Sequence, residues 1–306
     1  MSLAAYRRTG ADPPFGDPAA AHGVAMEGYY WRFTDVAAGR VVIVLCGACR
    51  APDGPWALVA VAAHPGGFMR WARVDDCSLS GRAVRAGDVL EADDGRLRVR
   101  LEGASVDATW LADHPWPAGA TFGGLGPAQI VPFLGQYWHP HLLLGSARGS
   151  ALLGDEDVAL DAAKIYAEKN WGSTFARDWW WGQAHGLGDG VACVAFAGGR
   201  LLGQAPTSVV VALDDRVLRR SPPLTAVTTS TAPGQWRVRA GDVELEAEAD
   251  PAAAHMLPVP VPAERRVEMR SAQHLAGRLA VTVRRRGGTV FRGESELAGL
   301  ERGAPS

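Results

Sequence analysis

Glycine and proline interrupt this chain at short intervals along its whole length. The 306 residues include 37 glycines and 20 prolines, and these residues end regular elements and form turns. The runs between them read as strands, most clearly Arg96–Leu101, where polar and apolar side chains alternate as on a strand with one buried face. Many short elements of this kind predict an all-β fold of barrels or sandwiches with few short helices.

Several segments read as strands by composition and alternation. They are Tyr29–Phe33, Arg40–Leu45, Trp56–Ala62, Arg96–Leu101, Asp107–Leu111, Val191–Ala195, Ser208–Leu213, Trp236–Arg239, Val243–Ala247 and Arg278–Arg284. Gly126–Gly135 and Asp155–Lys169 look helical, although the second also permits strands. The hexapeptide Val-Arg-Ala-Gly-Asp-Val occurs at 84–89 and again at 238–243, which indicates either duplicated β units or a common hairpin turn.

Length and composition describe a chain with a substantial core. Of its residues, 47% are hydrophobic and 21% are charged, and the length suffices for one large or two ordinary domains. We expect the boundary in the Gly- and Pro-rich stretch Pro115–Pro132, with an N-terminal β domain at 1–130 and a C-terminal β domain at 131–306. The net charge of −2 lacks the basic surplus that binding to nucleic acid requires, so no nucleic-acid partner is expected.

The sequence shows no segment typical of membrane insertion or secretion. Its longest apolar run, Val41–Cys49, is far shorter than the roughly 20 residues that cross a bilayer. The segment Met1–Phe15 lacks the apolar stretch of a secretory signal. We therefore expect a cytoplasmic protein.

Cys46 and Cys49 have the spacing of a redox or zinc motif. They end a strand-like run, however, with no helix pattern after them and no second pair of the same spacing. Ordinary buried thiols are the favoured interpretation.

Three residue types are scarce in this chain and gather in one short segment. There are two lysines, one asparagine and three isoleucines, all encoded by A/T-rich codons, which points to a G/C-rich coding sequence. Four of them, Lys164, Ile165, Lys169 and Asn170, lie within seven residues, which indicates either a local chemical demand or chance. Tryptophan, with 11 residues in the chain, is also concentrated in this region.

Spacing predicts which side chains of the region share a face. His139 and His141 are two residues apart, so on a strand both project to the same side. Trp179, Trp181 and Gln183 are spaced in the same way. The second set would present two indole rings and an amide on a single surface.

Three separated motifs resemble those of the tocopherol cyclases of plants and cyanobacteria. They read Gln136-Tyr-Trp-His-Pro-His-Leu-Leu-Leu-Gly145, Tyr166-Ala-Glu-Lys-Asn-Trp-Gly172 and Trp179-Trp-Trp-Gly-Gln183. Met26-Glu-Gly-Tyr-Tyr-Trp-Arg-Phe33 is similar to a further motif of that family, with Met26 and Tyr29 in place of the usual Phe and Trp, and Val267–Leu300 resembles its tail. The resemblance spans nearly the whole chain. It implies two lipocalin-like (calycin) β-barrel domains in tandem, distantly related to carotenoid hydratases.

The resemblance also implies a reaction. Tocopherol cyclases close a chromanol ring: the prenyl double bond nearest the ring of a prenylated hydroquinone gains a proton, and the phenol oxygen captures the tertiary cation. This isomerisation needs no metal, nucleotide or other cofactor, and the sequence contains no Walker pattern and no strand–GxGxxG–helix unit. The implied partner is a hydrophobic prenylated quinol, for which peripheral contact with a membrane is plausible, and the oligomeric state stays open.

Such chemistry requires an acid, a surface that stabilises a cation and a proton acceptor. A buried carboxyl group stays neutral near pH 7 and can protonate an alkene, and the motifs offer Glu168, Asp178 and Glu27. Indole faces stabilise a cation and exclude water, and the imidazole of His139 or His141 could accept the phenol proton. The other motif side chains are expected to bind substrate: Tyr30, Trp138, Lys169, Asn170, Trp171, Trp179, Trp181 and Gln183.

The three acids also have structural interpretations. Glu168 can form an ion pair with Lys169, although adjacent residues on a strand face opposite ways. Glu27 can pair with Arg32 or another arginine, and Asp178 can belong to a surface turn.

The rings have structural interpretations as well. His139 and His141 flank a proline and can cap a turn, and as zinc ligands they lack a third partner in the sequence, so no metal is expected. Trp179 and Trp181 can be core residues, and Trp180, which faces the other way, is expected to be structural.

Two other functions remain open. A hydratase or cyclase of another terpenoid could share the fold and the cation, with water as the trapping group in a hydratase. A non-catalytic carrier of lipid quinones would bind the same ligands and return them unchanged.

Overall fold

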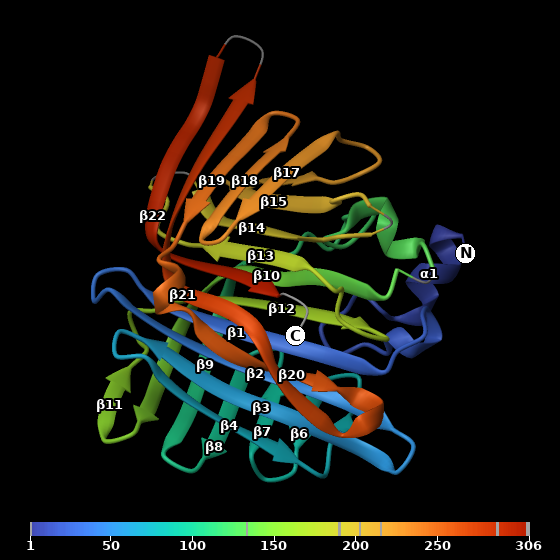
Figure 1. Cartoon of the computed structure of the whole chain (residues 1–306), viewed down its shortest axis with the longest axis vertical. Coiled ribbons are helices and arrows are strands. Elements are labelled where there is room, and N and C mark those ends of the chain that lie inside the picture. Colours follow the sequence, from blue (N-terminus) through green and yellow to red (C-terminus); the bar gives the residue numbers. More distant parts are fainter. Residues whose placement is uncertain are drawn as a thin grey trace. The chain divides into compact units, whose positions relative to one another are not determined.

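The computed structural model of the chain describes residues 2–132, 134–188, 191–201, 203–214, 216–285 and 288–303. Strands dominate these residues (Figure 1), and the helical segments are short: α1 (Leu3–Thr9), η1 (Pro18–Ala20), η2 (Gly126–Ile130), η3 (Pro251–Ala253) and η4 (Pro262–Glu264). The prediction of an all-β chain with few short helices is confirmed. Within the described residues, no helix is long and apolar enough to cross a membrane.

Contacts divide the chain into two compact units. The first takes its residues from 1–115, 130–175 and 258–269, and the second from 116–129, 176–257 and 270–306. Each unit therefore contains segments from both sides of residue 130, whereas the sequence predicts a single domain boundary there. The strands of the first two central motifs belong to the first unit, and the Trp179–Gln183 motif belongs to the second.

The first unit is built on one antiparallel sheet in the spatial order β4-β3-β2-β1-β12-β10-β9-β8-β7-β6-β5, with β11 paired to β10. Its strands are β1 (Met26–Asp35), β2 (Arg40–Ala51), β3 (Gly54–His64), β4 (Phe68–Val74), β5 (Ser78–Leu79), β6 (Ala83–Ala86), β7 (Leu90–Asp93), β8 (Arg96–Leu101), β9 (Ala104–Pro115), β10 (Gln136–Leu153), β11 (Glu156–Ala159) and β12 (Lys164–Gly172). The first strand, β1, pairs with the last, β12.

The second unit repeats this plan in the order β16-β15-β14-β13-β22-β21-β19-β18-β17, with β20 paired to β21. Its strands are β13 (Trp179–Ala184), β14 (Val191–Gly199), β15 (Thr207–Leu213), β16 (Arg216–Arg220), β17 (Val227–Ala232), β18 (Gln235–Ala240), β19 (Val243–Glu248), β20 (His255–Val261), β21 (Arg266–Arg285) and β22 (Gly288–Gly303). β20 ends, and β21 begins, in the segment 258–269 that belongs to the first unit. Again the first strand, β13, pairs with the last, β22.

Alternation along the strands separates an inner face, which packs into each core, from an outer face. In the first unit Tyr29, Trp31 and Phe33 of β1 enter the core, so Tyr30 and Arg32 lie on the outer face. In the second unit Trp180 and Ala184 of β13 enter the core, so Trp179, Trp181 and Gln183 lie on the outer face. The expected split between Trp180 and its two neighbours is therefore observed.

The structure decides two alternatives that the sequence left open. Asp155–Lys169 forms strand β11 and most of β12, and the helix-like segment at 126–135 is a 3₁₀ turn over Gly126–Ile130. The repeated hexapeptide makes the hairpins β6–β7 and β18–β19, with Gly87 and Gly241 at φ values of 49° and 62°. β10 and β21 occupy corresponding places in the two sheets. The hairpin β18–β19 lies next to β21, whereas β8 and β9 lie between β10 and the hairpin β6–β7. The two hairpins therefore do not correspond, and the repeated hexapeptide is a common turn and not a duplicated unit.

All four cysteines are buried thiols that form no disulfide among the described residues: Cys46, Cys49, Cys77 and Cys193. Cys46 packs into the first core. Cys49 belongs to a separate cluster with Met26, Trp56 and Leu58. The two cysteines of the Cys46–Cys49 motif thus face different surroundings, as expected for ordinary buried thiols.

Gly149 allows β10 to pass close to β9. Its φ is +137°, and a Cβ atom there would lie 2.1 Å from the carbonyl oxygen of Asp107. We predict that Gly149→Ala lowers the free energy of unfolding by about 3 kcal/mol. The backbone strain of an alanine at this positive φ adds to the clash of its Cβ atom with the carbonyl oxygen of Asp107. Gly39→Ala is the matched control, since Gly39 has a φ of +61° and no atom within 4 Å of its Cβ position. It should cost only about 1 kcal/mol; equal shifts of the two variants in urea unfolding would contradict the prediction.

Candidate functional site

Three neighbouring strands, β1, β12 and β10, carry most of the predicted site residues. Their register places Tyr30 opposite Glu168, and His139 opposite Lys169. Because adjacent strand residues face opposite sides, Glu168 and Asn170 lie on the outer face, and Lys169 and Trp171 lie on the inner face. The structure therefore places the predicted residues on two opposite faces of the sheet.

Glu168 is the centre of the outer-face group. Its side chain is 5% exposed, and its Oε2 accepts a hydrogen bond of 2.6 Å from Nε1 of Trp138. The hydroxyl of Tyr166 donates to the same oxygen. With Tyr30 directly across on β1, the carboxyl group is surrounded by three aromatic residues, two of which bond to it as neutral donors.

Asn170 extends this group by one amide. It lies opposite Trp138 on β10 and opposite Gly28 on β1. Its Oδ1 is buried and has no hydrogen-bond partner among the described residues. A Cβ atom on Gly28 would come within 2.6 Å of that oxygen, so the glycine of the Glu-Gly motif makes room for the amide. We call Tyr30, Trp138, Tyr166, Glu168 and Asn170 the Glu168 cluster.

Lys169 faces the other way and binds the N-terminal segment. Its Nζ donates to the carbonyl oxygens of Pro13 at 2.8 Å and Gly16 at 3.4 Å, and lies 5.0 Å from the ring centroid of Trp171. Phe15 enters the first core and stacks on Tyr29 at 5.4 Å. Residues 3–22, here called the N-terminal plug, are thus attached to the inner face of β12. Burial is the main reason that the pKa of Lys169 falls to about 8.

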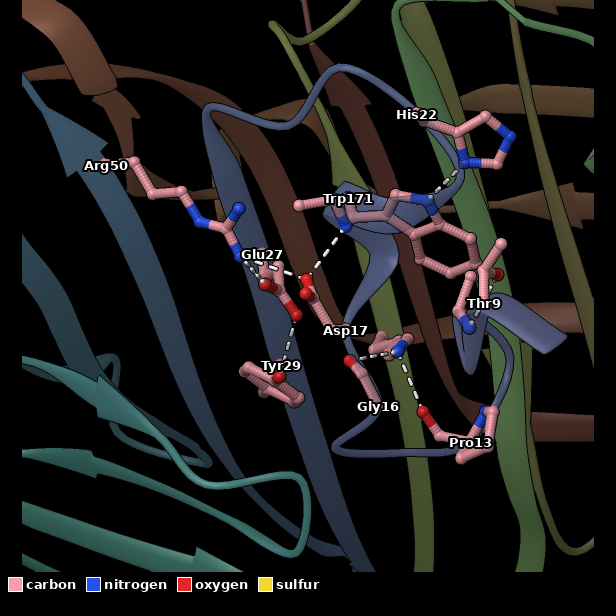
Figure 2. A network of polar contacts seen from close by, with 12 residues as sticks. Thr9, Pro13, Gly16, Asp17, His22, Glu27, Tyr29, Arg50 and Trp171 are labelled. Atoms are coloured by element: carbon pink, nitrogen blue, oxygen red, sulfur yellow. Dashed lines mark hydrogen bonds and ion pairs between the residues drawn. The ribbon is translucent and has the colours of Figure 1, made fainter. Parts of the chain in front are cut away.

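Glu27 and Trp171 belong to the same network (Figure 2). Glu27 is 1% exposed; Arg50 binds its Oε1 at 3.0 Å and the Tyr29 hydroxyl binds its Oε2 at 3.1 Å. Burial raises the pKa of Glu27, and the charges of Lys169 and Arg50 oppose the rise. Nε1 of Trp171 donates to Nδ1 of His22 in the plug at 3.1 Å. The arginine partner of Glu27 is therefore Arg50, where the sequence suggested Arg32 or another arginine.

The two histidines lie within β10 and do not cap a turn. His139 is 4% exposed and sits opposite Lys169. The register shifts between Pro140 and Leu142, which places His141 in a bulge. Burial and the charge of Lys169 lower the pKa of His141 to about 3, so its imidazole is neutral at pH 7. The described residues contain no group of three or more His, Cys, Asp or Glu side chains placed to hold a metal ion.

In the second unit, Trp179, Trp181 and Gln183 line the outer face of β13, as their spacing predicts. Nε1 of Trp179 donates to Oε1 of Glu301 on β22 at 2.6 Å. Trp181 lies directly opposite Glu301. Nε1 of Trp180, on the core side, donates to the hydroxyl of Thr207 at 2.9 Å, which agrees with its expected structural role.

Asp178 precedes β13 and is held by two arginines. Its Oδ2 lies 2.9 Å from Nε of Arg200, and its Oδ1 lies 3.6 Å from Nε of Arg302. The side chain is 15% exposed. Asp178 is thus an ion-paired residue at the start of a strand.

Sequence reasoning missed two residues of these groups. Tyr166 precedes Glu168 by two positions, so strand alternation could have placed it on the same face. Glu301 lies beyond the motifs, and only its pairing with β13 reveals it. Burial raises the pKa of Glu301, and the hydrogen bond from Trp179 opposes the rise.

The sequence profile of the tocopherol cyclase-like family matches residues 128–304. This chain belongs to the tocopherol cyclase-like family. The matched region includes β10, β12, β13 and β22, and it begins after β1 and the Met26–Phe33 motif. No curated protein sequence matches the chain.

Solved structures show the same fold at low sequence identity. Kievitone hydratase from Nectria haematococca has a TM-score of 0.58 and 12% identity, over 97% of this chain and 91% of that chain. CghA with Sch210972 has a TM-score of 0.58 and 11% identity, over 92% and 89%. The protein NE1406 from Nitrosomonas europaea has a TM-score of 0.56 and 16% identity, over 92% and 93%. With two curled antiparallel sheets in the chain, the predicted pair of lipocalin-like barrels is confirmed.

The depressed pKa of Lys169 predicts a pH dependence of stability. Between pH 8 and 10.5 the unfolded chain holds a proton on this lysine that the folded chain has lost, so the free energy of unfolding rises with pH. Relative to Lys169→Met, which cannot titrate, the wild type should gain up to about 1.4 kcal/mol per pH unit in this window. Urea unfolding of both proteins from pH 7 to 10 measures the difference. A difference that stays constant would show that Lys169 keeps an ordinary pKa.

Proposed function

We propose that this member of the family is an enzyme that closes a chromanol ring on a prenylated hydroquinone by acid catalysis. The observation that carries the proposal is the Glu168 cluster: a buried carboxyl group that accepts hydrogen bonds from an indole and a phenol, on the strand with the family motif. Such a group can protonate an alkene where water is scarce.

The contacts of the three candidate acids favour Glu168 as the proton donor. Arg50 and Tyr29 occupy the two oxygens of Glu27, and arginines approach both oxygens of Asp178. An arginine beside a carboxylate favours its charged form and opposes protonation, although at Glu27 burial outweighs this effect and raises the pKa. Oε2 of Glu168 accepts hydrogen bonds from two neutral donors, the indole of Trp138 and the hydroxyl of Tyr166.

The proposed reaction begins when the Glu168 carboxyl group transfers its proton to the double bond nearest the quinol ring. A C–H bond forms, the π bond breaks, and a tertiary cation and a carboxylate result. The faces of Trp138 and Tyr30 stabilise the cation, an effect of about 2 kcal/mol for a desolvated ring. The phenol oxygen then forms the C–O bond, and its proton returns to the carboxylate. The product is an isomer of the substrate, and the acid is regenerated.

The phenol proton passes to Glu168 and not to a histidine because of the positions of His139 and His141. His139 shares its register position with Lys169, on the face opposite to Glu168. His141 is a weak base, with a pKa of about 3. The Glu168 carboxylate formed in the first step is the stronger proton acceptor.

We predict that Glu168→Gln lowers kcat at least about 100-fold, because an amide cannot donate a proton to carbon. Activity is measured as chromanol formed from a panel of phytyl and geranylgeranyl hydroquinones. Glu156→Gln is the control, since Glu156 is 57% exposed and pairs only with Arg40 among the described residues. Full activity of a folded Glu168→Gln protein would remove Glu168 as the donor, and no chromanol from the wild type with any quinol would exclude the reaction.

Hydration of a terpenoid double bond is the second candidate, and one observation favours it. The similar structure from Nectria haematococca is a hydratase by name, and water would trap the same tertiary cation as an alcohol. Reactions in ¹⁸O-labelled water distinguish the two. Cyclisation, which we expect, incorporates no label, whereas a labelled tertiary alcohol would assign the chain to hydration.

A further inference from the structure

The outer face of the second sheet carries buried polar side chains that the proposed reaction does not use. Gln183 on β13 is fully buried, as are Gln273 and, nearly, Ser271 on β21. Glu301 on β22 lies between them, opposite Trp181 on one side and Gln273 on the other. Opposite residues of paired strands have Cβ atoms about 5 Å apart, and diagonal ones remain within reach of long side chains. These residues therefore form one surface.

Gln183 has an unsatisfied acceptor. Its Nε2 contacts Sγ of Cys193 at 3.5 Å, which is a weak interaction. Its Oε1 is buried and has no hydrogen-bond partner among the described residues. An unpaired buried carbonyl destabilises a fold, and most buried polar groups are paired. A ligand that brings an O–H donor would satisfy it.

Glu301 lies diagonally across the β13–β22 pair from Gln183, which is opposite Gly299. The indole of Trp179 donates to its Oε1 at 2.6 Å. Gly303 makes room for the indole, because a Cβ atom there would lie 2.1 Å from ring atoms of Trp179. Burial favours the neutral form of Glu301 by raising its pKa, and a neutral carboxyl group has an O–H to donate.

We propose that Gln183 and Glu301 form a binding site for an aromatic hydroxyl group. The Gln183 carbonyl accepts the hydroxyl proton, the Glu301 carboxyl group donates to the hydroxyl oxygen, and the Trp181 indole packs against the ring. The inference rests on the proposed function in one respect: it identifies the hydroxyl as one of the quinol. It restricts the ligands to free phenols and excludes their ethers.

Binding of unreactive ligands tests this site separately from turnover. The probes are a hydroquinone with a saturated alkyl chain, which has no double bond to protonate, and its dimethyl ether, which has no O–H donor. By isothermal titration under nitrogen, the wild type should bind the hydroquinone at least about tenfold more tightly than the ether. Gln183→Leu should reduce this preference below about threefold while ether binding changes little. Gln235→Leu, at an exposed position of β18, is the matched control and should keep the full preference.

Two variants of Glu301 keep the test decisive if Gln183→Leu does not fold. Glu301→Leu should lose the preference, whereas Glu301→Gln, which still offers a donor and an acceptor, should retain most of it. Equal binding of the two probes by the wild type, or an undiminished preference in folded Gln183→Leu or Glu301→Leu, would overturn the proposal. A wild type that shows the preference but forms no chromanol would overturn the proposed function and leave this site standing.

Discussion

Pairing of the first strand of each sheet with the last is the constraint on which the rest of the structure depends. In the first unit it sets β1 beside β12, so that Tyr30 and Glu168, far apart in sequence, become direct neighbours. In the second unit it sets β13 beside β22 and brings Trp181 next to Glu301. Backbone hydrogen bonds along these pairs fix the register, and a slip of one residue would exchange the inner and outer faces. The other strand pairs build on these two registers: β10 adds Trp138 beside β12, and β21 adds Gln273 beside β22.

Alternation then gives consecutive motif residues different tasks. On β12 the order Glu168, Lys169, Asn170 alternates between the cluster on the outer face and the plug on the inner face. Lys164 donates a hydrogen bond to Ser146, and Lys169 donates to the carbonyl oxygens of Pro13 and Gly16. The amide of Asn170 occupies the space that a side chain on Gly28 would need. Ile165 packs into the first core. For the two lysines and the isoleucine these contacts are structural, and local demand stays a hypothesis for their clustering.

Sequence patterns predicted what depends on local periodicity. The strand at Arg96–Leu101 and the shared face of Trp179, Trp181 and Gln183 follow from period-two alternation, and the structure has both. The N-terminal plug was not predictable from the sequence, because α1 is short and the attachment of the plug depends on Lys169, about 150 residues away. Glu301 was missed for a similar reason, since its indole partner lies 122 positions earlier in the chain. Contacts between distant strands leave no local periodic signal.

Two kinds of partner distinguish four buried or half-buried acids of this chain. Glu27 and Asp178 lie beside arginines, and a guanidinium always carries a charge that favours the carboxylate. Glu168 and Glu301 instead accept an indole N–H, each at 2.6 Å. An indole orients a carboxyl group without itself adding a positive charge, so this contact does not favour the charged form as a guanidinium does. By this criterion Glu301, outside every motif, belongs with Glu168, whereas Glu27 and Asp178, inside or beside motifs, do not. The electrostatic character of the partner therefore groups these acids differently from membership of a motif.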